Sequence, residues 1–448
     1  MIELVLIIIF CLLGVATGVL TGLLPGLHVN NVALILLSAS AGIVALCSPF
    51  IAAGLSEEFI YVLIAGYVIS VSTSHSFHDV LPTTFIGAPD EDNALSVLPA
   101  HSFLLEGKGY QAIAYSALGS YGAIVICLLL LYVIRFTIGN PLNLYSTLND
   151  IMFYVLLAIT ILMLGTEKTQ IPENKNRPSS YLAGTLFAFF VFVLSGVFGI
   201  IALDIHLTSP FGLDASVLFP TLAGLFGMPT LLTSLLEKPN IPPQEIKKPT
   251  FSKKEKKDSI LSVITGSLAG ILVSIIPGIT SSTGTILAMN ARQASGKDQT
   301  IVTLSAVNTA SAFSVIVVLF IILRPRSGAA LAVSNLIVLQ EWTQVSIPLN
   351  LTYLLIFIIL AGGLSYFSTL FIGKSFAKKF ANVPYTLLVS LTILLVTGMV
   401  AIFTGILGLY LLLSATIIGF LPIHWGVRRS HCMGFLLIPI MLYFFPGF

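Results

Sequence analysis

The chain has 448 residues, of which 56% are hydrophobic and only 9% are charged. A soluble domain carries about 25% charged residues, so the composition excludes a soluble protein. At roughly 20 apolar residues per span, it predicts a polytopic membrane protein with about 10 to 14 spans. The net charge of +2 is too small to indicate a nucleic-acid partner.

The expected organisation is two membrane repeats, residues 1–236 and 259–448, joined by a polar linker, residues 237–258. The linker is rich in lysine and proline, and its lysines place it in the cytoplasm by the positive-inside rule. Residues 1–23 are not expected to be a signal peptide, because Glu3 stands where a basic residue is usual. Long apolar segments are expected at 30–54 and at 281–323, among others.

A glycine-rich motif that ends in Pro-Gly occurs twice with the same internal spacing. The first copy contains Gly14, Gly18, Gly22, Pro25, Gly26 and Leu27, and the second contains Gly266, Gly270, Ser274, Pro277, Gly278 and Ile279. Pro-Gly breaks a membrane helix, so backbone groups at membrane depth need other partners. Interrupted apolar segments at corresponding places in two halves are the best sequence indication of a transporter's substrate site.

A polar patch follows each Pro-Gly and is the first candidate for substrate binding. The patches are His28, Asn30 and Asn31 in the first copy and Thr280, Ser281, Ser282 and Thr283 in the second. Free N–H groups at the start of the following half-helix favour an anion, and the hydroxyls and amides can orient it or coordinate a cation. The alternative is a plain kink whose hydroxyls bond back to their own helix.

A second pair of blocks extends the repeat, since Ser70–Asp79 has a counterpart in the similarly polar block Ser305–Ser314, and Thr73 falls opposite Thr309. We expect Thr73, Ser74, Asn308 and Thr309 to complete the substrate site. The alternative is that these small residues only allow two helices to approach closely.

Ionisable residues near the second block are candidates for coupling or gating. His75, His78 and Asp79 have the spacing of one helical face, and such residues at membrane depth are usually functional. A proton relay and a solvated helix end both remain open, while a metal site lacks a fourth ligand.

A charge contrast follows the second block. The first repeat carries an acidic cluster that includes Asp90, and the second repeat carries Arg324 and Arg326, with Asp90 opposite Arg326 in the alignment. The arginines either bind an anionic substrate through their planar forks, pair with the acidic cluster as a gate, or are ordinary loop charges. Arg135 is expected to anchor the end of a span, and Trp342 and Trp425 to lie at the membrane interface.

These motifs are similar to those of a known family. The segment Gly14–Leu27, the run GAPDEDNALSVLPAHSFLLEGKG that ends at Gly109, and the second-half segments Gly270–Ile279 and Val307–Ser311 resemble the permease subunit of tripartite tricarboxylate transporters, the TctA family. The resemblance implies secondary uptake of carboxylate anions, together with a small membrane subunit and an extracytoplasmic solute-binding protein.

The sequence therefore predicts an all-α polytopic protein of the cell membrane, with two related halves of inverted topology and broken helices around a midplane site. It would transport a small organic anion, a di- or tricarboxylate, coupled to H⁺ or Na⁺. Neither enzymatic activity nor a cofactor or resident metal is expected, because Walker A, Gly-x-Ser-x-Gly and His-Glu-x-x-His motifs do not occur in the sequence. The alternatives are a flippase for a polyprenyl-phosphate lipid carrier, and a scaffold whose polar patches pack without a cavity.

Overall fold

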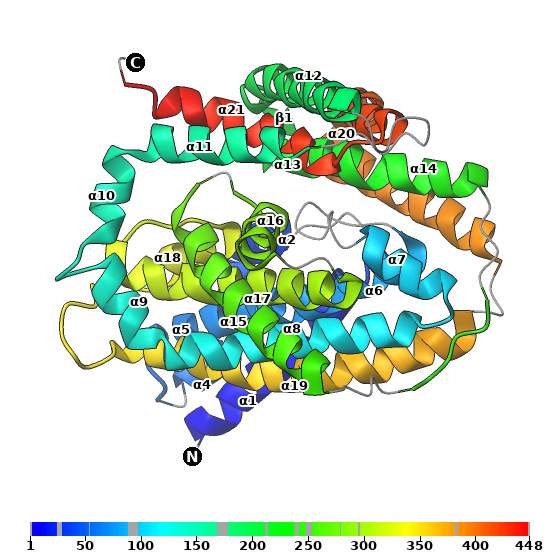
Figure 1. The fold of residues 1–448 in the computed structure, drawn as a ribbon. Helices are drawn as coiled ribbons and strands as arrows, with labels where there is room; N and C mark the ends of the chain where they lie inside the picture. The colour runs from blue at the N-terminus through cyan, green and yellow to red at the C-terminus, as the bar shows by residue number, and fades with distance from the viewer. Residues whose placement is uncertain are drawn as a thin grey trace.

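Long apolar helices lie side by side and carry most of the chain (Figure 1). The computed structural model describes residues 2–24, 29–52, 54–87, 97–167, 178–210, 214–237, 242–247, 253–277, 279–293, 296–380 and 384–446. In these ranges nine helices are long and apolar enough to cross a membrane, or ten if the bent pair of α10 and α11 is one span. The prediction of an all-α polytopic membrane protein is confirmed.

The first half contains short helices between the long ones. Its elements are α1 (Ile2–Gly22), α2 (Val29–Ser38), α3 (Ser40–Leu46), α4 (Ser48–Ala52), α5 (Glu57–His78), α6 (Val80–Ile86), α7 (Val97–Leu105), α8 (Gly109–Leu129), α9 (Leu131–Ile138), α10 (Leu144–Asp150), α11 (Met152–Gly165), α12 (Pro178–Leu203), β1 (Leu207–Thr208), β2 (Asp214–Ala215), α13 (Leu218–Leu222), the π-helix η2 (Ala223–Gly227) and α14 (Met228–Glu237). The two short strands pair antiparallel. The segment expected as one apolar stretch at 30–54 forms α2, α3 and α4 instead.

The second half repeats this use of long and interrupted helices. Its elements are α15 (Lys253–Ile275), α16 (Ser281–Arg292), α17 (Lys297–Ile322), α18 (Gly328–Leu336), α19 (Leu349–Phe380), α20 (Tyr385–Trp425), the 3₁₀ helix η3 (Arg429–Met433) and α21 (Gly434–Tyr443). The expected segment 281–323 is divided between α16 and α17. Gly405, at a φ of 67°, breaks the regular geometry inside α20.

The polar linker is partly structured. Its last residues, from Lys253, form the first turns of α15. Its described part, residues 242–247, lies against the turn between α7 and α8, where Glu245 N–H donates to the Gly107 carbonyl at 2.7 Å. The Gln244 side chain accepts from Gly109 N–H at 2.9 Å. The linker is therefore held at this end of the helices.

Two helix pairs pack through the repeated glycines. A Cβ on Gly18 of α1 would lie 2.5 Å from Ser74 Cβ and 2.6 Å from the Val71 carbonyl oxygen of α5. A Cβ on Gly270 of α15 would lie 2.6 Å from Ala310 Cβ and 2.5 Å from the Val307 carbonyl oxygen of α17. In the alignment that places Thr73 opposite Thr309, Val71 falls opposite Val307 and Ser74 opposite Ala310, so the two pairs make corresponding contacts.

Each of these pairs is parallel. Along α1, Gly14 approaches Ser70 and Gly22 approaches His78, so residue numbers rise together on α1 and α5. Along α15, Gly266 approaches Ala306 and Gly270 approaches Ala310 of α17 in the same way. Because the members of each pair are parallel, the chain must return to the starting end between them. The short helices α2 to α4 lie on this return in the first pair, and α16 does in the second.

The two pairs run in opposite directions, as their shared neighbours α8 and α19 show. α8 is parallel to α17, because Ser116 bonds to Ser305 and Gly139, just after α9, approaches Ile321. α8 is antiparallel to α19, because Ile113 approaches Gly373 and Ile124 approaches Gly362.

α19 in turn is parallel to α5, since Phe357 approaches Gly66 and Ser368 bonds to His78. α5 and α17 are consequently antiparallel. Asn308 of α17 also donates a hydrogen bond to Asp79, which directly follows α5.

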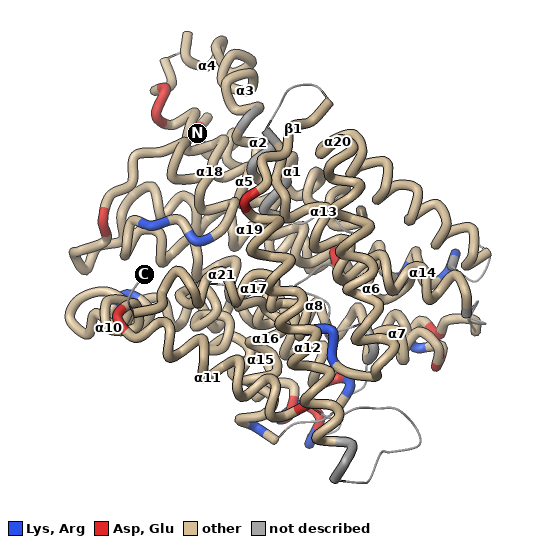
Figure 2. Tube along the Cα trace, turned by 90° about the horizontal axis from the view of Figure 1, so that it is seen from above, with Lys and Arg blue, Asp and Glu red and all other residues tan. Residues whose placement is uncertain are grey.

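Charged residues are few, so most of the trace in Figure 2 is tan. Acidic and basic residues gather around α7 and α14, at the end of the bundle where α15 begins with its lysines. Lys297, at the start of α17, binds Glu106 there at 3.0 Å. This contact holds the pKa of Glu106 below its usual value.

Candidate functional site

The break between α15 and α16 presents the start of a helix to a buried polar region. Pro277 cannot continue α15, because it has no N–H to donate. Thr280 then caps α16, and its hydroxyl accepts from Thr283 N–H at 3.4 Å. The start of α16 carries the partial positive charge of the helix dipole, which suits an anionic ligand.

Asn308 connects this helix start to both helix pairs. Its Oδ1 accepts from the Ser281 hydroxyl of α16 at 3.3 Å, and its Nδ2 donates to Asp79 Oδ2 at 3.4 Å. Asn308 itself lies in the middle of α17 and is only 8% exposed. A single buried amide therefore joins α16, α17 and the end of α5.

A cavity of about 360 Å³, here called the α16 cavity, opens beside Asn308. Its wall contains five of the predicted substrate-binding residues, from three segments: Pro277, Thr280 and Ser281 at the helix break, Asn308 of α17, and Arg326 in the loop after α17. The first repeat contributes Ser72 and Ser76 of α5 and Val29 at the start of α2. Leu436 and Ile440 of α21 close an apolar side.

Ser72 and Ser76 of α5 are among the cavity residues that the sequence reasoning did not assign to the site. The signal was available, because the alignment of Thr73 with Thr309 places Ser72 opposite Asn308 and Ser76 opposite Ala312. Asn308 and Ala312 also line the α16 cavity. The predicted role of Asn308, transferred to its counterpart Ser72, would have identified the face of α5 that lines the cavity.

Several other candidates lie close to the cavity without belonging to its described wall. Ser74 bonds across to the Val15 carbonyl of α1 at 2.9 Å, which fits the close-packing alternative. Thr73 is buried, and Thr309 is buried with no hydrogen-bond partner for its hydroxyl among the described residues. Ser282 and Thr283 are buried in the first turn of α16.

The three ionisable residues at the end of α5 contact three different helices. His75 contacts Thr21 of α1 at 3.1 Å, and His78 contacts Ser368 of α19 at 2.9 Å. Asp79 follows the last residue of α5 and reaches Asn308. Asp79 keeps helical backbone angles and its N–H donates to the His75 carbonyl at 3.0 Å, so the helical spacing of the three residues is kept. Their side chains nevertheless reach three different helices, and the proton relay stays a prediction.

Some sequence candidates lie outside the described residues. These are Pro25, Gly26, His28, Gly278 and Asp90. Asn30 and Asn31 lie in the first turns of α2, which matches the expected half-helix, but their side chains are not described. The predicted pairing of Asp90 with Arg326 therefore stays a prediction.

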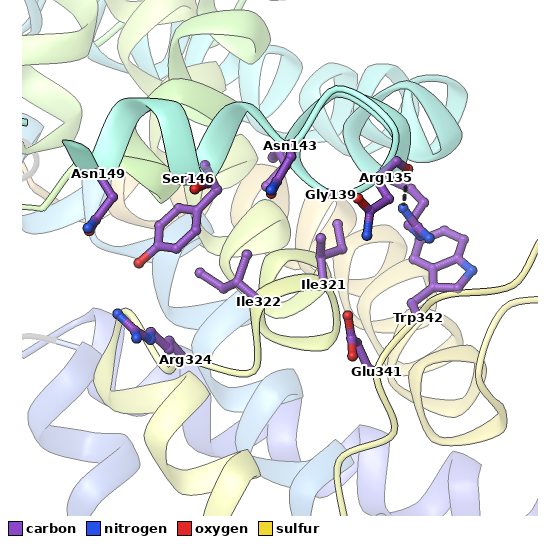
Figure 3. Close-up of a pocket in the computed structure, with 13 residues that line it drawn as sticks. Arg135, Gly139, Asn143, Ser146, Asn149, Ile321, Ile322, Arg324, Glu341 and Trp342 are labelled. Carbon is purple, nitrogen blue, oxygen red and sulfur yellow. Dashed lines mark hydrogen bonds between the residues drawn. The ribbon is translucent and has the colours of Figure 1, made fainter. Parts of the chain in front are cut away.

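The two arginines after α17 line different cavities. Arg326 faces the α16 cavity, whereas Arg324 lines a second cavity of about 350 Å³, here called the α10 cavity (Figure 3). Arg326 also donates to the hydroxyl of Tyr145 on α10 at 2.8 Å. Tyr145 lines the α10 cavity, so this contact stands between the two spaces. Within the described part of the chain, no three His, Cys, Asp or Glu side chains converge in a metal-binding group.

Interrupted helices that meet at a buried polar cavity, inside a bundle of apolar helices, define a membrane transport protein. The chain belongs to the tripartite tricarboxylate transporter TctA family, whose model matches residues 8–434. This result confirms the resemblance inferred from the motifs, and with it a multi-pass permease. The uncharacterized protein MJ1079 of Methanocaldococcus jannaschii is 28% identical over 450 residues, covering 98% of this chain and 99% of that protein. No solved structure is significantly similar to the chain.

Proposed function

We propose that this protein is a secondary transporter of a small organic anion, a di- or tricarboxylate, and that the α16 cavity holds the substrate. The observation that carries this proposal is the convergence of a helix start, several hydroxyls and one arginine on a single cavity. A volume of about 360 Å³ lies within the range of roughly 300–1,000 Å³ typical of small-molecule sites.

The electrostatics of the α16 cavity favour an anion. Arg326 is the one charged side chain among its described lining residues, and a guanidinium binds carboxylates through paired hydrogen bonds. Thr280 and Ser281 supply hydroxyls beside the positive end of α16. A scaffold without a cavity does not fit this arrangement.

The two helix-pair units are proposed to be inverted repeats. The support is the corresponding packing of Gly18 and Gly270, combined with the antiparallel course of α5 and α17. Their interface contributes Ser72 and Asn308 to the same cavity, as expected for transporters whose substrate site lies between inverted repeats. Alternating access would then be a movement of one unit against the other.

The coupling ion is proposed to act near Asn308 and Asp79. Hydroxyl, amide and carboxylate oxygens of Ser281, Asn308 and Asp79 lie within one hydrogen-bonded chain. Such oxygen ligands suit a hard cation, so they favour Na⁺, whereas protonation of Asp79 would provide H⁺ coupling. An imposed gradient of each ion, applied separately, distinguishes the two.

The lysine-rich end of the bundle is proposed to face the cytoplasm of the cell, following the positive-inside rule. The α10 cavity would then face outward. The name of the family also implies partners, and we propose a small membrane subunit and an extracytoplasmic solute-binding protein that delivers the anion.

The test is uptake of radiolabelled citrate and other di- and tricarboxylates into proteoliposomes, with imposed Na⁺ or H⁺ gradients. Ser281→Ala should reduce uptake about tenfold, because it removes a buried hydroxyl from the cavity and from Asn308. Ser375→Ala is the matched control, since that hydroxyl is exposed and bonds only within α19.

Polyprenyl phosphate forms a second arm of the same experiment. Transbilayer movement of that lipid, without uptake of any carboxylate, would contradict the carboxylate proposal and support the flippase alternative. Uptake that Ser281→Ala and Ser375→Ala reduce equally would argue against the α16 cavity as the substrate site.

A further inference from the structure

The α10 cavity has the features of a separate binding site. Its wall comes from α9, α10, the end of α17 and the segment around Trp342. Figure 3 shows Ser146 and Asn149 on one side facing Arg324, with Arg135 and Trp342 on the other. Glu341 is an exposed acidic residue of the same wall, so the two arginines exceed the acidic charge by one.

Two buried donors at this cavity have no acceptor within the described part of the chain. Arg135 is 5% exposed and is held by the carbonyls of Asn140 at 2.7 Å and Thr343 at 2.9 Å. Its Nε, like Nε1 of the fully buried Trp342, has no hydrogen-bond partner among the described residues. Buried polar groups are normally satisfied. Since both atoms can only donate, the missing partner is an acceptor.

A polar contact separates the α10 cavity from the α16 cavity. The Tyr145 hydroxyl and the Arg326 guanidinium are 2.8 Å apart, and Arg326 Cζ lies 5.1 Å from the centre of the Tyr145 ring. Tyr145 belongs to α10, which bends by 76° into α11. Because Arg326 also lines the α16 cavity, an anion bound there would compete with the Tyr145 hydroxyl for its guanidinium.

We propose that the α10 cavity is a second binding station for the carboxylate substrate, and that the Tyr145–Arg326 contact is the gate between it and the α16 cavity. The substrate class rests on the proposed function, while the station itself rests on the donors of Arg135, Arg324 and Trp342. An anion that leaves Arg324 for Arg326 takes the place of the Tyr145 hydroxyl. Substrate transfer and opening of the gate are then one exchange of hydrogen bonds.

Trp342 provides a direct optical test, because the chain has only two tryptophans. Trp425 lies elsewhere, stacked on Phe187, so Trp425→Phe leaves Trp342 as the single indole fluorophore. Citrate is titrated into the full-length purified protein, with sodium chloride of equal ionic strength as the salt control. The difference between wild type and Trp342→Phe gives the same information if Trp425→Phe does not fold.

The expected result is a saturable citrate-dependent change in Trp342 fluorescence. Arg324→Gln should weaken the apparent affinity about tenfold, since it removes a charged donor at a partly exposed site. Ser281→Ala, at the α16 cavity, should leave that affinity unchanged. Lys247→Gln controls for loss of a positive charge, because Lys247 lies at the opposite end and is 73% exposed.

Absence of a citrate response, or an equal loss in Ser281→Ala and Arg324→Gln, would overturn the second station. The proteoliposome assay keeps the two proposals apart. A Trp342 response without uptake of any carboxylate would reject the transport proposal and leave the binding station standing. Carboxylate uptake without a Trp342 response would reject the binding station and leave the transport proposal standing.

Discussion

Replacing Asn308 by alanine tests whether this residue holds the candidate site together. Asn308 is 8% exposed and joins α16 through Ser281 at 3.3 Å and α5 through Asp79 at 3.4 Å. Both hydrogen bonds are long, so the low end of the usual free-energy range applies to each. A neutral bond contributes about 0.5 kcal/mol and a bond to a charged group about 1.5 kcal/mol. The expected loss of unfolding free energy is therefore about 2 kcal/mol.

The assay is reversible unfolding in mixed micelles, with Asn335→Ala as the matched control. Asn335 donates to the Leu331 carbonyl on the exposed side of α18, so its loss should cost about 0.5 kcal/mol or less. A double-mutant cycle with Ser281→Ala should give a coupling energy of about 0.5 kcal/mol. Equal destabilisation by the two asparagine variants, with zero coupling to Ser281, would refute the joining role of Asn308.

Three further predictions concern packing, charge and gating. Gly270→Ala places a methyl group against the α17 backbone and should cost about 1–3 kcal/mol by overpacking, whereas Gly363→Ala, with nothing within 4 Å of its Cβ, should leave the melting temperature unchanged. Glu167→Gln should lower the unfolding free energy by about 3 kcal/mol in the same assay, because it removes the charge of a carboxylate that is 3% exposed and pairs with Arg428 at 2.8 Å; an effect no larger than that of Gly363→Ala would contradict this. Tyr145→Phe frees Arg326 from a competing bond and should tighten citrate binding at the α16 cavity about two- to tenfold in calorimetry. Unchanged or weaker binding would argue against the exchange.

The repeated glycine motif made a large part of the architecture predictable. Gly18 and Gly270 stand at the closest approaches of their helix pairs, and spacing alone located them because only a residue without a side chain fits there. Pro277, which lacks an N–H, and Thr280, a favoured N-cap residue, likewise predicted the helix break. The helix break depends on neighbours close in sequence, and the glycine contacts were found because the motif occurs twice, which is why the sequence reveals both.

The remaining parts depend on contacts between distant segments. Arg135 and Trp342, expected at the membrane interface, are buried together at the α10 cavity, and they are far apart in the sequence. His78 was expected to share a helical face with His75 and Asp79, but its partners Ser368 and Thr369 come from α19, far away in the sequence. Helical spacing shows which residues share a face of one helix, but not which other helix packs against that face.

The placement of three arginines gives a reason to connect the two cavities. Lysine residues gather at the end of the bundle where α15 begins, and the positive-inside rule places such an end in the cytoplasm. Arg135, Arg324 and Arg326 lie instead where α9 and α17 end, and each lines one of the two cavities. With the lysine-rich end facing the cytoplasm, as proposed, these arginines would oppose the bias, and anion binding would account for them. A series of positive groups from the open α10 cavity to the α16 cavity would attract a dicarboxylate from solution and pass it, one guanidinium at a time, to the start of α16.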